Sequence, residues 1–249
     1  MIEARNISAG YGEKSVLDGF FASFEKGRLT SIIGANGSGK STLLKVMLGI
    51  LPVVRGEILL DGVDLSELGR TDIARRISYL PQGRAVPDMT VEQLVLHGRF
   101  PYLSYPRRYR AEDREIARAA MDTVGILQFS DSPLHALSGG MRQNAYIAMA
   151  LAQDTDYILL DEPTTYLDIS HQLELMRMLR TLADGGKGIV TVMHDLPMAF
   201  DFSDNILAID SGKVAAAAEP STVYNSPVVR EIFGVELERS ADGKYHYKY

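Results

Sequence analysis

Residues 34–41, Gly-Ala-Asn-Gly-Ser-Gly-Lys-Ser, constrain the fold of this chain more than any other segment. They fit the pattern G-x-x-x-x-G-K-S at every fixed position. An apolar run at 29–33 precedes them, and a run of helix-forming residues at 42–48 follows. The pattern works only where a strand leads through a tight loop into a helix, so that arrangement is predicted here. Such a loop directs backbone N–H groups and the helix start at one anion, which predicts phosphate binding.

The residue types of this loop suit the phosphate chain of a nucleotide. The glycines let the backbone turn inward, and the Lys40 ammonium can reach the β- and γ-phosphates. The Ser41 hydroxyl is placed to bind Mg²⁺, and Thr42 to add a bond to the inner phosphates. The alternative is a glycine-rich turn that only joins strand to helix, but such a turn does not need Lys followed by Ser. The predicted nucleotide contacts of the loop are Gly34, Ala35, Asn36, Gly37, Ser38, Gly39, Lys40, Ser41 and Thr42.

The composition narrows the class of protein. With 249 residues, 46% of them hydrophobic, the chain can bury a full core in one large domain or two small ones. Cysteine is absent, and the first segment lacks both a basic stretch and an apolar core, so we expect a cytosolic protein without a signal peptide. No run approaches the roughly 18 apolar residues of a membrane span. The net charge of −6 argues against nucleic acid as a partner.

The periodicity along the chain predicts an α/β protein. Short apolar segments between turn signals predict an antiparallel sheet from about 1–30 and 55–65, with an Asp-Gly turn near the end of the second part. Helical patterns dominate about 84–155, and most of the remainder forms the nucleotide-binding core. After residue 209 only a short tail rich in Ala, Pro and Ser is expected. Tyr11, between two glycines, either offers its ring to a nucleobase or only packs within a turn.

Three further apolar strands end in polar residues: Gln82, Asp161 with Glu162, and His194. Because ligands bind at the carboxyl ends of strands in open α/β sheets, these side chains are expected beside the nucleotide loop. Asp161 is placed to hold the Mg²⁺ shell opposite Ser41, and Glu162 to accept a proton from the attacking water. The alternatives are a lone Gln, a pair of surface acids and a structural His. The shared placement at strand ends favours function.

A second anion-binding segment is predicted at 137–141. Ser138, Gly139 and Gly140 stand directly before a helical run, where a hydroxyl and free backbone N–H groups can bind phosphate. The alternative is a plain helix cap, which does not require two consecutive glycines. Since the first loop already surrounds its own nucleotide, a second phosphate cap in the chain is most useful to a neighbouring molecule.

A basic segment, Arg107-Arg108-Tyr109-Arg110, interrupts the helical region. Such a segment is usually a solvated surface. The other interpretation is a contact with an anionic partner or with lipid headgroups.

Together these motifs resemble the ATP-binding subunits of ABC transporters over nearly the whole chain. The matching motifs are a Walker A motif at 34–41, a Q-loop at Gln82, a signature at 137–141, a Walker B strand ending at Asp161, a catalytic glutamate at Glu162, a D-loop at Asp168 and an H-loop at His194. The resemblance implies a catalytic set of Glu162, His194 and Gln82, and a metal set of Ser41, Gln82 and Asp161. It also implies that Asp168 belongs to the nucleotide site. Met141 departs from the family, which usually has Gln there, so an amide contact from that position is absent.

The resemblance implies a P-loop NTPase core with a mainly parallel sheet, a flanking antiparallel β-subdomain and an inserted α-helical subdomain, all in a single ABC ATPase domain over residues 1–249. It implies an ATPase that uses ATP and Mg²⁺ and pairs head to tail with a second copy. Each ATP would then lie between Lys40 of one copy and Ser138 of the other. The pair would sit at the cytoplasmic face of the membrane and drive integral permease subunits, with a substrate-binding protein as an indirect partner. Segments 97–101, 111–113 and 163–168 look most like importers of iron-siderophore complexes, haem or cobalamin.

Two other functions stay open at this point. A soluble ABC ATPase of translation or DNA repair would share these motifs, although such proteins usually carry two nucleotide cassettes or long insertions. A nucleotide-binding regulator without hydrolysis is disfavoured because Glu162 and His194 occur together.

Overall fold

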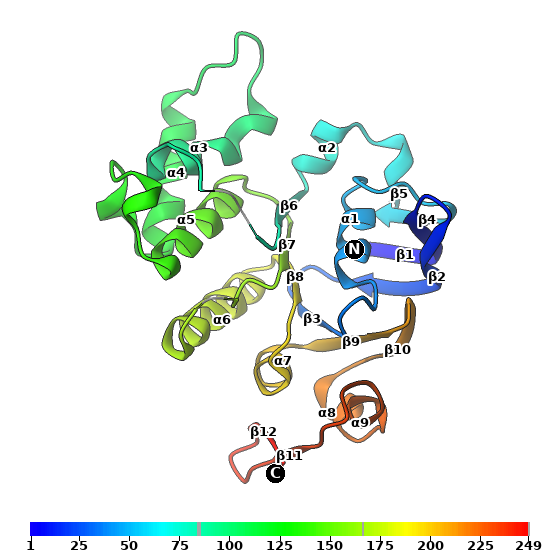
Figure 1. Cartoon of the computed structure of the whole chain (residues 1–249). Helices are drawn as coiled ribbons and strands as arrows, with labels where there is room; N and C mark the ends of the chain where they lie inside the picture. Colours follow the sequence, from blue (N-terminus) through cyan, green and yellow to red (C-terminus); the bar gives the residue numbers. More distant parts are fainter. Residues whose placement is uncertain (84–85, 166, 249) are drawn as a thin grey trace.

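The computed structural model describes residues 1–83, 86–165 and 167–248, and Figure 1 shows how their elements are arranged. The strands are β1 (Ile2–Tyr11), β2 (Lys14–Phe24), β3 (Leu29–Ile33), β4 (Arg55–Leu60), β5 (Val63–Asp64), β6 (Ile77–Leu80), β7 (Tyr157–Asp161), β8 (Gly188–Val192), β9 (Asn205–Asp210), β10 (Lys213–Ala218), β11 (Leu237–Arg239) and β12 (Tyr245–Tyr247). The α-helices are α1 (Lys40–Met47), α2 (Arg70–Ala74), α3 (Val91–Leu96), α4 (Ala111–Thr123), α5 (Gly139–Ala152), α6 (Ile169–Asp184), α7 (Leu196–Phe202), α8 (Pro220–Tyr224) and α9 (Val228–Phe233). Short 3₁₀ helices lie at η1 (Leu65–Glu67), η2 (His97–Tyr102), η3 (Leu127–Phe129) and η4 (Leu134–Ala136).

A six-stranded sheet with the order β10-β9-β3-β8-β7-β6 forms the centre of the molecule. The strands from β9 to β6 are parallel to one another, and β10 pairs antiparallel with β9 at one edge. Every residue of β3, β7 and β8 is buried, as expected for parallel strands covered on both faces. The predicted α/β class with a mainly parallel sheet is confirmed.

A second sheet is antiparallel and has the strand order β2-β1-β4-β5. Its β4–β5 hairpin turns at Asp61 and Gly62, whose φ angles of 51° and 85° are those of a tight two-residue turn. This confirms the predicted Asp-Gly turn. β2 is one continuous strand with irregular pairing to β1, where separate short strands were expected. The borders proposed for the subdomains stay predictions, and residue 84 lies outside the described residues.

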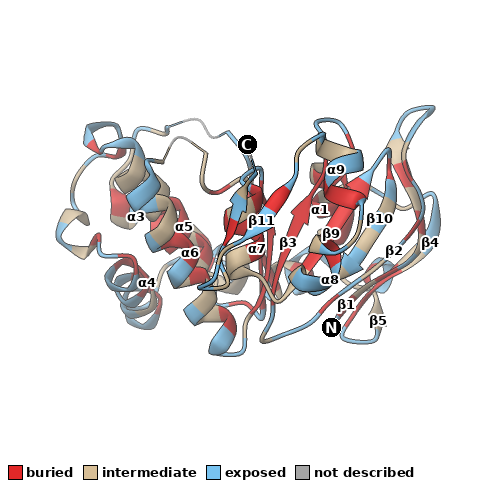
Figure 2. Cartoon of the chain, turned by 90° about the horizontal axis from the view of Figure 1, so that it is seen from below, coloured by how far each residue is buried: buried red, intermediate tan, exposed pale blue. Residues whose placement is uncertain are grey.

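Two hydrophobic clusters lie on opposite faces of the central sheet. One joins the sheet to α1 and the antiparallel sheet, through residues such as Phe20, Ile32 and Leu43. The other joins the sheet to helices α3 to α7, through residues such as Met121 and Leu160. Figure 2 shows the buried residues along the central strands and on the inward faces of these helices. Across the described ranges, no helix has the length and apolar character needed to cross a bilayer.

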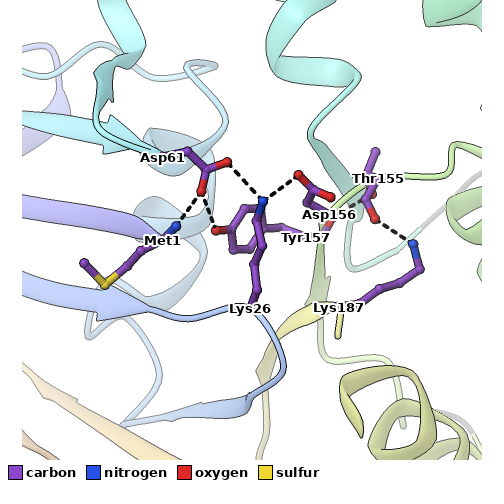
Figure 3. A network of polar contacts seen from close by, with 7 residues as sticks. All are labelled: Met1, Lys26, Asp61, Thr155, Asp156, Tyr157 and Lys187. Carbon is purple, nitrogen blue, oxygen red and sulfur yellow. Dashed lines mark hydrogen bonds and ion pairs between the residues drawn. The ribbon is translucent and has the colours of Figure 1, made fainter. Parts of the chain in front are cut away.

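A polar network ties the two sheets together at the amino end of β7 (Figure 3). The Tyr157 hydroxyl donates to Asp61 Oδ1 over 3.0 Å, from the central sheet to the turn of the antiparallel sheet. Lys26 lies between the carboxylates of Asp61 and Asp156, at 3.3 and 2.7 Å. Burial, followed by the hydrogen bond to Asp61, raises the pKa of Tyr157 well above its usual range. The neutral phenol is therefore the form that holds this junction.

Candidate active site

The strand order places the predicted site residues along one edge of the sheet. The loop 34–41 follows β3, His194 follows β8, Asp161 ends β7 with Glu162 next to it, and Gln82 follows β6. These four strands are parallel neighbours in that order. The side chains that the sequence predicted to meet at the carboxyl edge therefore come from four adjacent strands.

Glu162 is the point where the predicted catalytic residues meet. Its Oε1 lies 2.5 Å from His194 Nε2, and its Oε2 accepts a hydrogen bond of 2.5 Å from Gln82 Nε2. Thr165 Oγ1 donates to the same Oε2 over 3.3 Å. The Glu162 backbone has φ of 53°, which costs free energy for any residue other than glycine and is found most often at functional sites. The contact from Thr165 was not predicted.

The glycines of the loop are required by close approach and backbone angle. A Cβ on Gly34 would lie 2.3 Å from the carbonyl oxygen of Ile209, and Gly39 has φ of 109°. Gly39 precedes α1 without any side-chain cap from the described residues, so the first N–H groups of α1 stay available to an anion. The Ser38 hydroxyl oxygen is buried without a hydrogen-bond partner among the described residues. Ala35, Asn36 and Gly37 are exposed at the loop tip, Ser41 is half-buried, and Ser38, Gly39, Lys40 and Thr42 are buried.

Lys40 bonds to its own loop. Its Nζ donates to the carbonyl oxygens of Gly34 and Ala35 over 2.8 and 2.9 Å. Burial lowers the pKa of Lys40, while the charges of Glu162 and Asp161 act in the opposite direction. Burial removes the hydration that stabilises the charged ammonium, and a bound phosphate would stabilise that charge instead. The loop carbonyls hold the ammonium where the phosphate is expected.

Asp161 has the surroundings of a metal-binding carboxylate. Its Oδ1 is buried and has no hydrogen-bond partner among the described residues, while Oδ2 accepts a long 3.5 Å bond from the Tyr79 hydroxyl. Burial, together with the charge of Glu162, raises the pKa of Asp161. A hydrogen bond from Ser41 acts in the opposite direction but does not cancel the increase. The described residues contain no group of three or more His, Asp or Glu that could hold a metal ion by themselves. The unpartnered Asp161 Oδ1 is an oxygen donor of the kind that suits Mg²⁺, which proteins commonly bind through one or two oxygen ligands together with substrate phosphates.

The predicted second phosphate cap is the start of α5. Ser138 is the N-cap residue, and its Oγ accepts a 3.3 Å hydrogen bond from the Met141 backbone N–H. Ser138 and Gly139 are exposed, and Gly140 is half-buried. Figures 1 and 2 both show α5 and α1 on opposite sides of the parallel strands. The Met141 side chain is partly buried against the core cluster of the helices.

Helix α5 also contacts the loop that follows Glu162. Gln143 Nε2 donates to the carbonyl oxygen of Pro163 over 2.6 Å. A cavity of about 400 Å³ lies beside these residues and is lined by Gln82, Gly139 and Glu162, among others. Gln143 was not predicted to matter, because a bond across 20 positions leaves no periodic signal in the sequence.

Tyr11 lies beside α1 and is half exposed. Its hydroxyl accepts a 3.2 Å hydrogen bond from Lys45 Nζ, which lowers the pKa of Tyr11, with a smaller contribution from Thr42. The residue is 48% exposed, and the Lys45 ammonium lies 5.5 Å from the centre of its ring. This geometry is compatible with the nucleobase interpretation, which stays a prediction.

Asp168 serves as the N-cap of α6. Its Oδ1 accepts from the His171 N–H and from the Ser170 hydroxyl, each over 3.0 Å. These bonds, led by the His171 backbone N–H, lower the pKa of Asp168 to about 2. An acid before a helical run is a known cap signal, and it could have predicted this role. Tyr166, in the segment 163–168 used for the resemblance, lies outside the described residues.

Comparisons with known proteins agree with this geometry. Residues 17–165 match the family described as ABC transporter. The chain is 42% identical to the petrobactin import ATP-binding protein FpuD of Bacillus anthracis, over 97% of this chain and 89% of that protein. It is 38% identical to the iron(3+)-hydroxamate import ATP-binding protein FhuC of Bacillus subtilis (strain 168), over 97% of this chain and 90% of that protein. The dimeric ATP-binding cassette MJ0796, in a post-hydrolysis state bound to ADP and Pi, superposes with a TM-score of 0.76 at 26% identity, over 88% of this chain and 99% of that one.

The family match covers more than half of the chain, and the relatives match over nearly all of it. The resemblance inferred from the motifs is thereby confirmed. The chain belongs to the ABC transporter family, as one of its ATP-binding ATPase subunits.

Proposed function

We propose that this ATPase subunit powers the import of an iron-siderophore complex or a related metal chelate. The names of its relatives support this substrate class. The observation that carries the proposed chemistry is the contact of Glu162 with both Gln82 and His194. His194 follows β8, which is the neighbour of β3, the strand that leads into the phosphate loop. The soluble translation or repair ATPase is disfavoured, because the relatives FpuD and FhuC are both import ATP-binding proteins.

Glu162 accepts the proton of the attacking water in this proposal. His194 and Gln82 orient its carboxylate from two sides, so that one lone pair faces the γ-phosphate. Lys40 and the α1 N–H groups bind the phosphate chain. Asp161 and Ser41 would hold Mg²⁺, which would supply positive charge to the phosphate chain. Tyr11 stacks on the base, and Asp168 orders the loop beside the nucleotide.

Two copies enclose each nucleotide in the proposed cycle. The exposed Ser138 and Gly139 of one copy contact the γ-phosphate held by Lys40 of the other. Moving an equilibrium from mostly open to mostly closed takes about 5.5 kcal/mol. Hydrogen bonds to charged groups contribute roughly 1.5–3 kcal/mol each, so two or three per nucleotide suffice. The dimeric state of the similar cassette MJ0796 supports this arrangement.

The permease contact is proposed at a cleft of about 380 Å³ between the end of α1, α2 and β6. Ile73, Tyr79 and Gln153 line it, together with Ile50, which is 62% exposed. Tyr79 lies three residues before Gln82, so movement in this cleft can reach the carboxylate of Glu162. This contact would hold the chain at the cytoplasmic face of the membrane as a peripheral subunit, with a substrate-binding protein acting through the permease.

The Glu162→Gln variant tests the chemistry. It is expected to bind ATP, to accumulate as a dimer in the presence of ATP, and to lose phosphate release by at least about a hundredfold, the contribution of a positioned general base. Size-exclusion chromatography with ATP and a phosphate-release assay measure both effects. Turnover at the wild-type rate would refute the role of Glu162. A variant that stays monomeric with ATP, both alone and with the permease, would refute the shared site.

The cargo is tested separately. Purification in mild detergent should recover the permease with this chain, and vesicles containing the complex should take up iron chelates in an ATP-dependent way. Uptake of an unrelated cargo, with none of the chelates transported, would overturn the proposed substrate class and leave the ATPase assignment intact.

A further inference from the structure

We propose that residues 103–110, here called the arginine loop, bind anionic lipid headgroups. Figure 1 shows this loop, between η2 and α4, standing out from the helices around it. The inference rests on the proposed membrane location and adds a direct contact with the bilayer.

The charge of the arginine loop contrasts with that of the chain. Residues 99–111 contain four arginines and no acidic residue, although the chain carries a net charge of −6. Arg99 is buried and pairs with Asp113 over 3.1 Å. Arg107 and Arg108 are exposed, and no described residue forms an ion pair with either of them. Their charges are therefore available to an external anion.

The tip of the arginine loop carries an aromatic side chain with no cover. Tyr105 is 96% exposed, which is the largest value among the exposed large hydrophobic residues of the described chain. A solvent-facing loop does not require such a ring. Tyrosine does suit the boundary of a bilayer, where its ring contacts acyl chains and its hydroxyl stays in the headgroup layer.

Buried contacts fix the base of the arginine loop. The Tyr102 hydroxyl donates to the carbonyl oxygen of Gln153 over 3.0 Å, and the Arg99 guanidinium lies 4.0 Å from the Tyr102 ring centre. Arg99 also donates to the carbonyl oxygen of Ala152 over 2.9 Å. At the other end, the Tyr109 ring lies 6.1 Å from that of Phe100. The exposed tip is therefore held in a set direction relative to α5.

The arginine loop flanks the cleft proposed for the permease. Gln153 lines that cleft and bonds to Tyr102 at the base of the loop. Arg75, directly after α2, donates to the carbonyl oxygen of Pro101 over 2.9 Å. Figure 1 shows α2 and the loop on the same side of the molecule. A permease seated in the cleft would bring the bilayer beside the loop.

Lipid suits the arginine loop better than a protein partner does. Its exposed tip stands out from the helices around it, and a headgroup layer offers a broad anionic surface to such a protruding cation. Each arginine near such a surface strengthens binding by about fivefold, and the effect decreases as salt rises.

The chain contains no tryptophan, so a single introduced tryptophan reports on its own position alone. The Tyr105→Trp variant carries a single tryptophan at the loop tip. We expect its emission to shift to shorter wavelength with vesicles of phosphatidylglycerol and phosphatidylcholine, but not with phosphatidylcholine alone. The Phe21→Trp variant places the probe on β2, where the native ring is 59% exposed, and should show no shift. No shift from Tyr105→Trp, or an equal shift with both vesicle types, would overturn the proposal.

Charge reversal tests the arginines. The double variant Arg107→Glu and Arg108→Glu should bind anionic vesicles at least about tenfold more weakly in co-sedimentation. A matched control, Arg177→Glu with Lys213→Glu, makes the same charge change at exposed positions on α6 and β10 and should bind within about twofold of wild type. Equal losses in both would show non-specific attraction and overturn the proposal.

A last measurement separates this inference from the proposed function. With permease in lipid-free detergent, the arginine-loop variant should keep the wild-type ATPase rate. Loss of that rate would place the loop on the permease and refute lipid as its partner. If vesicle binding is absent while ATPase and transport persist, the inference fails and the importer function stands.

Discussion

His194 Nε2 lies 2.5 Å from Glu162 Oε1, across the ends of the neighbouring strands β8 and β7. The other carboxylate oxygen accepts bonds from Gln82 and Thr165. Three partners occupy most of the lone-pair positions of this carboxylate. We therefore expect Glu162 to take the proton from water at the one lone-pair position that these partners leave free. Gln82 lies three residues after Tyr79, which lines the permease cleft, so it is the partner through which the membrane protein would control this step.

Replacement of His194 tests this geometry. His194→Ala should lower kcat by about a hundredfold with little change in KM, because the carboxylate loses its orientation while the phosphate loop is untouched. His194→Gln retains an N–H donor and should lose less. Steady-state phosphate release with the permease present measures both parameters. A kcat within twofold of wild type for His194→Ala would contradict the prediction.

Asp161→Asn should separate stability from activity. Burial raises the folded-state pKa of Asp161 above its ordinary value, so the folded chain holds this proton more tightly than the unfolded chain. Stability therefore falls as the pH rises from the ordinary value to the raised one, and the full cost is present above the raised value. Removing the charge should raise the Tm of the nucleotide-free protein by about 2–4 °C.

The same Asp161→Asn variant should lose the Mg²⁺-dependent part of its stabilisation by ATP, and with it turnover. Thermal unfolding at pH 7.5, with and without Mg²⁺ and ATP, provides the comparison. A lower Tm without nucleotide would show that the buried charge is compensated in a way the structure does not indicate.

Tyr157→Phe should lower the stability of the protein without lowering its ATPase rate. The lost bond to Asp61 is charge-assisted, so the free energy of unfolding should fall by roughly 1.5–3 kcal/mol. Tyr157 begins β7 and Asp161 ends it, so kcat per folded molecule should not change. Urea unfolding and phosphate release measure the two effects. Tyr105→Phe is the matched control, since Tyr105 is 96% exposed and no described residue bonds to its hydroxyl, so its loss should leave the stability nearly unchanged.

The pH dependence of unfolding gives a second test of Tyr157. Its pKa is raised in the folded state, so its stabilising contribution is complete below the ordinary value of about 10 and is lost as the pH rises above that value. The wild type should therefore lose stability between pH 9 and 11 more steeply than Tyr157→Phe. Equal slopes would show that the phenol titrates normally.

The sequence correctly predicted the parts of the site that depend on adjacent strands and on local motifs. Gln82, Glu162 and His194 could be placed together because parallel strands end at one edge of a sheet. The cap role of Asp168 was missed, although its local signal was present. The bond from Gln143 to Pro163 could not be found, because it depends on how α5 packs against the sheet. The expected tail after residue 209 was wrong: β10, α8, α9 and the β11–β12 hairpin form there, where Ala-rich and short segments gave little periodicity.

Met141 tests how much the departure from the usual signature residue matters. Its backbone N–H bonds to Ser138, while its side chain is partly buried against the helical core, so it acts mainly through packing. Met141→Gln keeps the backbone bond and places an amide at a half-buried position, where water can still reach it. We expect the ATPase rate with permease to change by less than about tenfold, or 1.4 kcal/mol. Ser138→Ala serves as the comparison, since it removes the hydroxyl proposed to contact phosphate and should cost more. A larger effect at Met141 than at Ser138 would show that the fifth signature position, rather than the cap, controls closure over ATP.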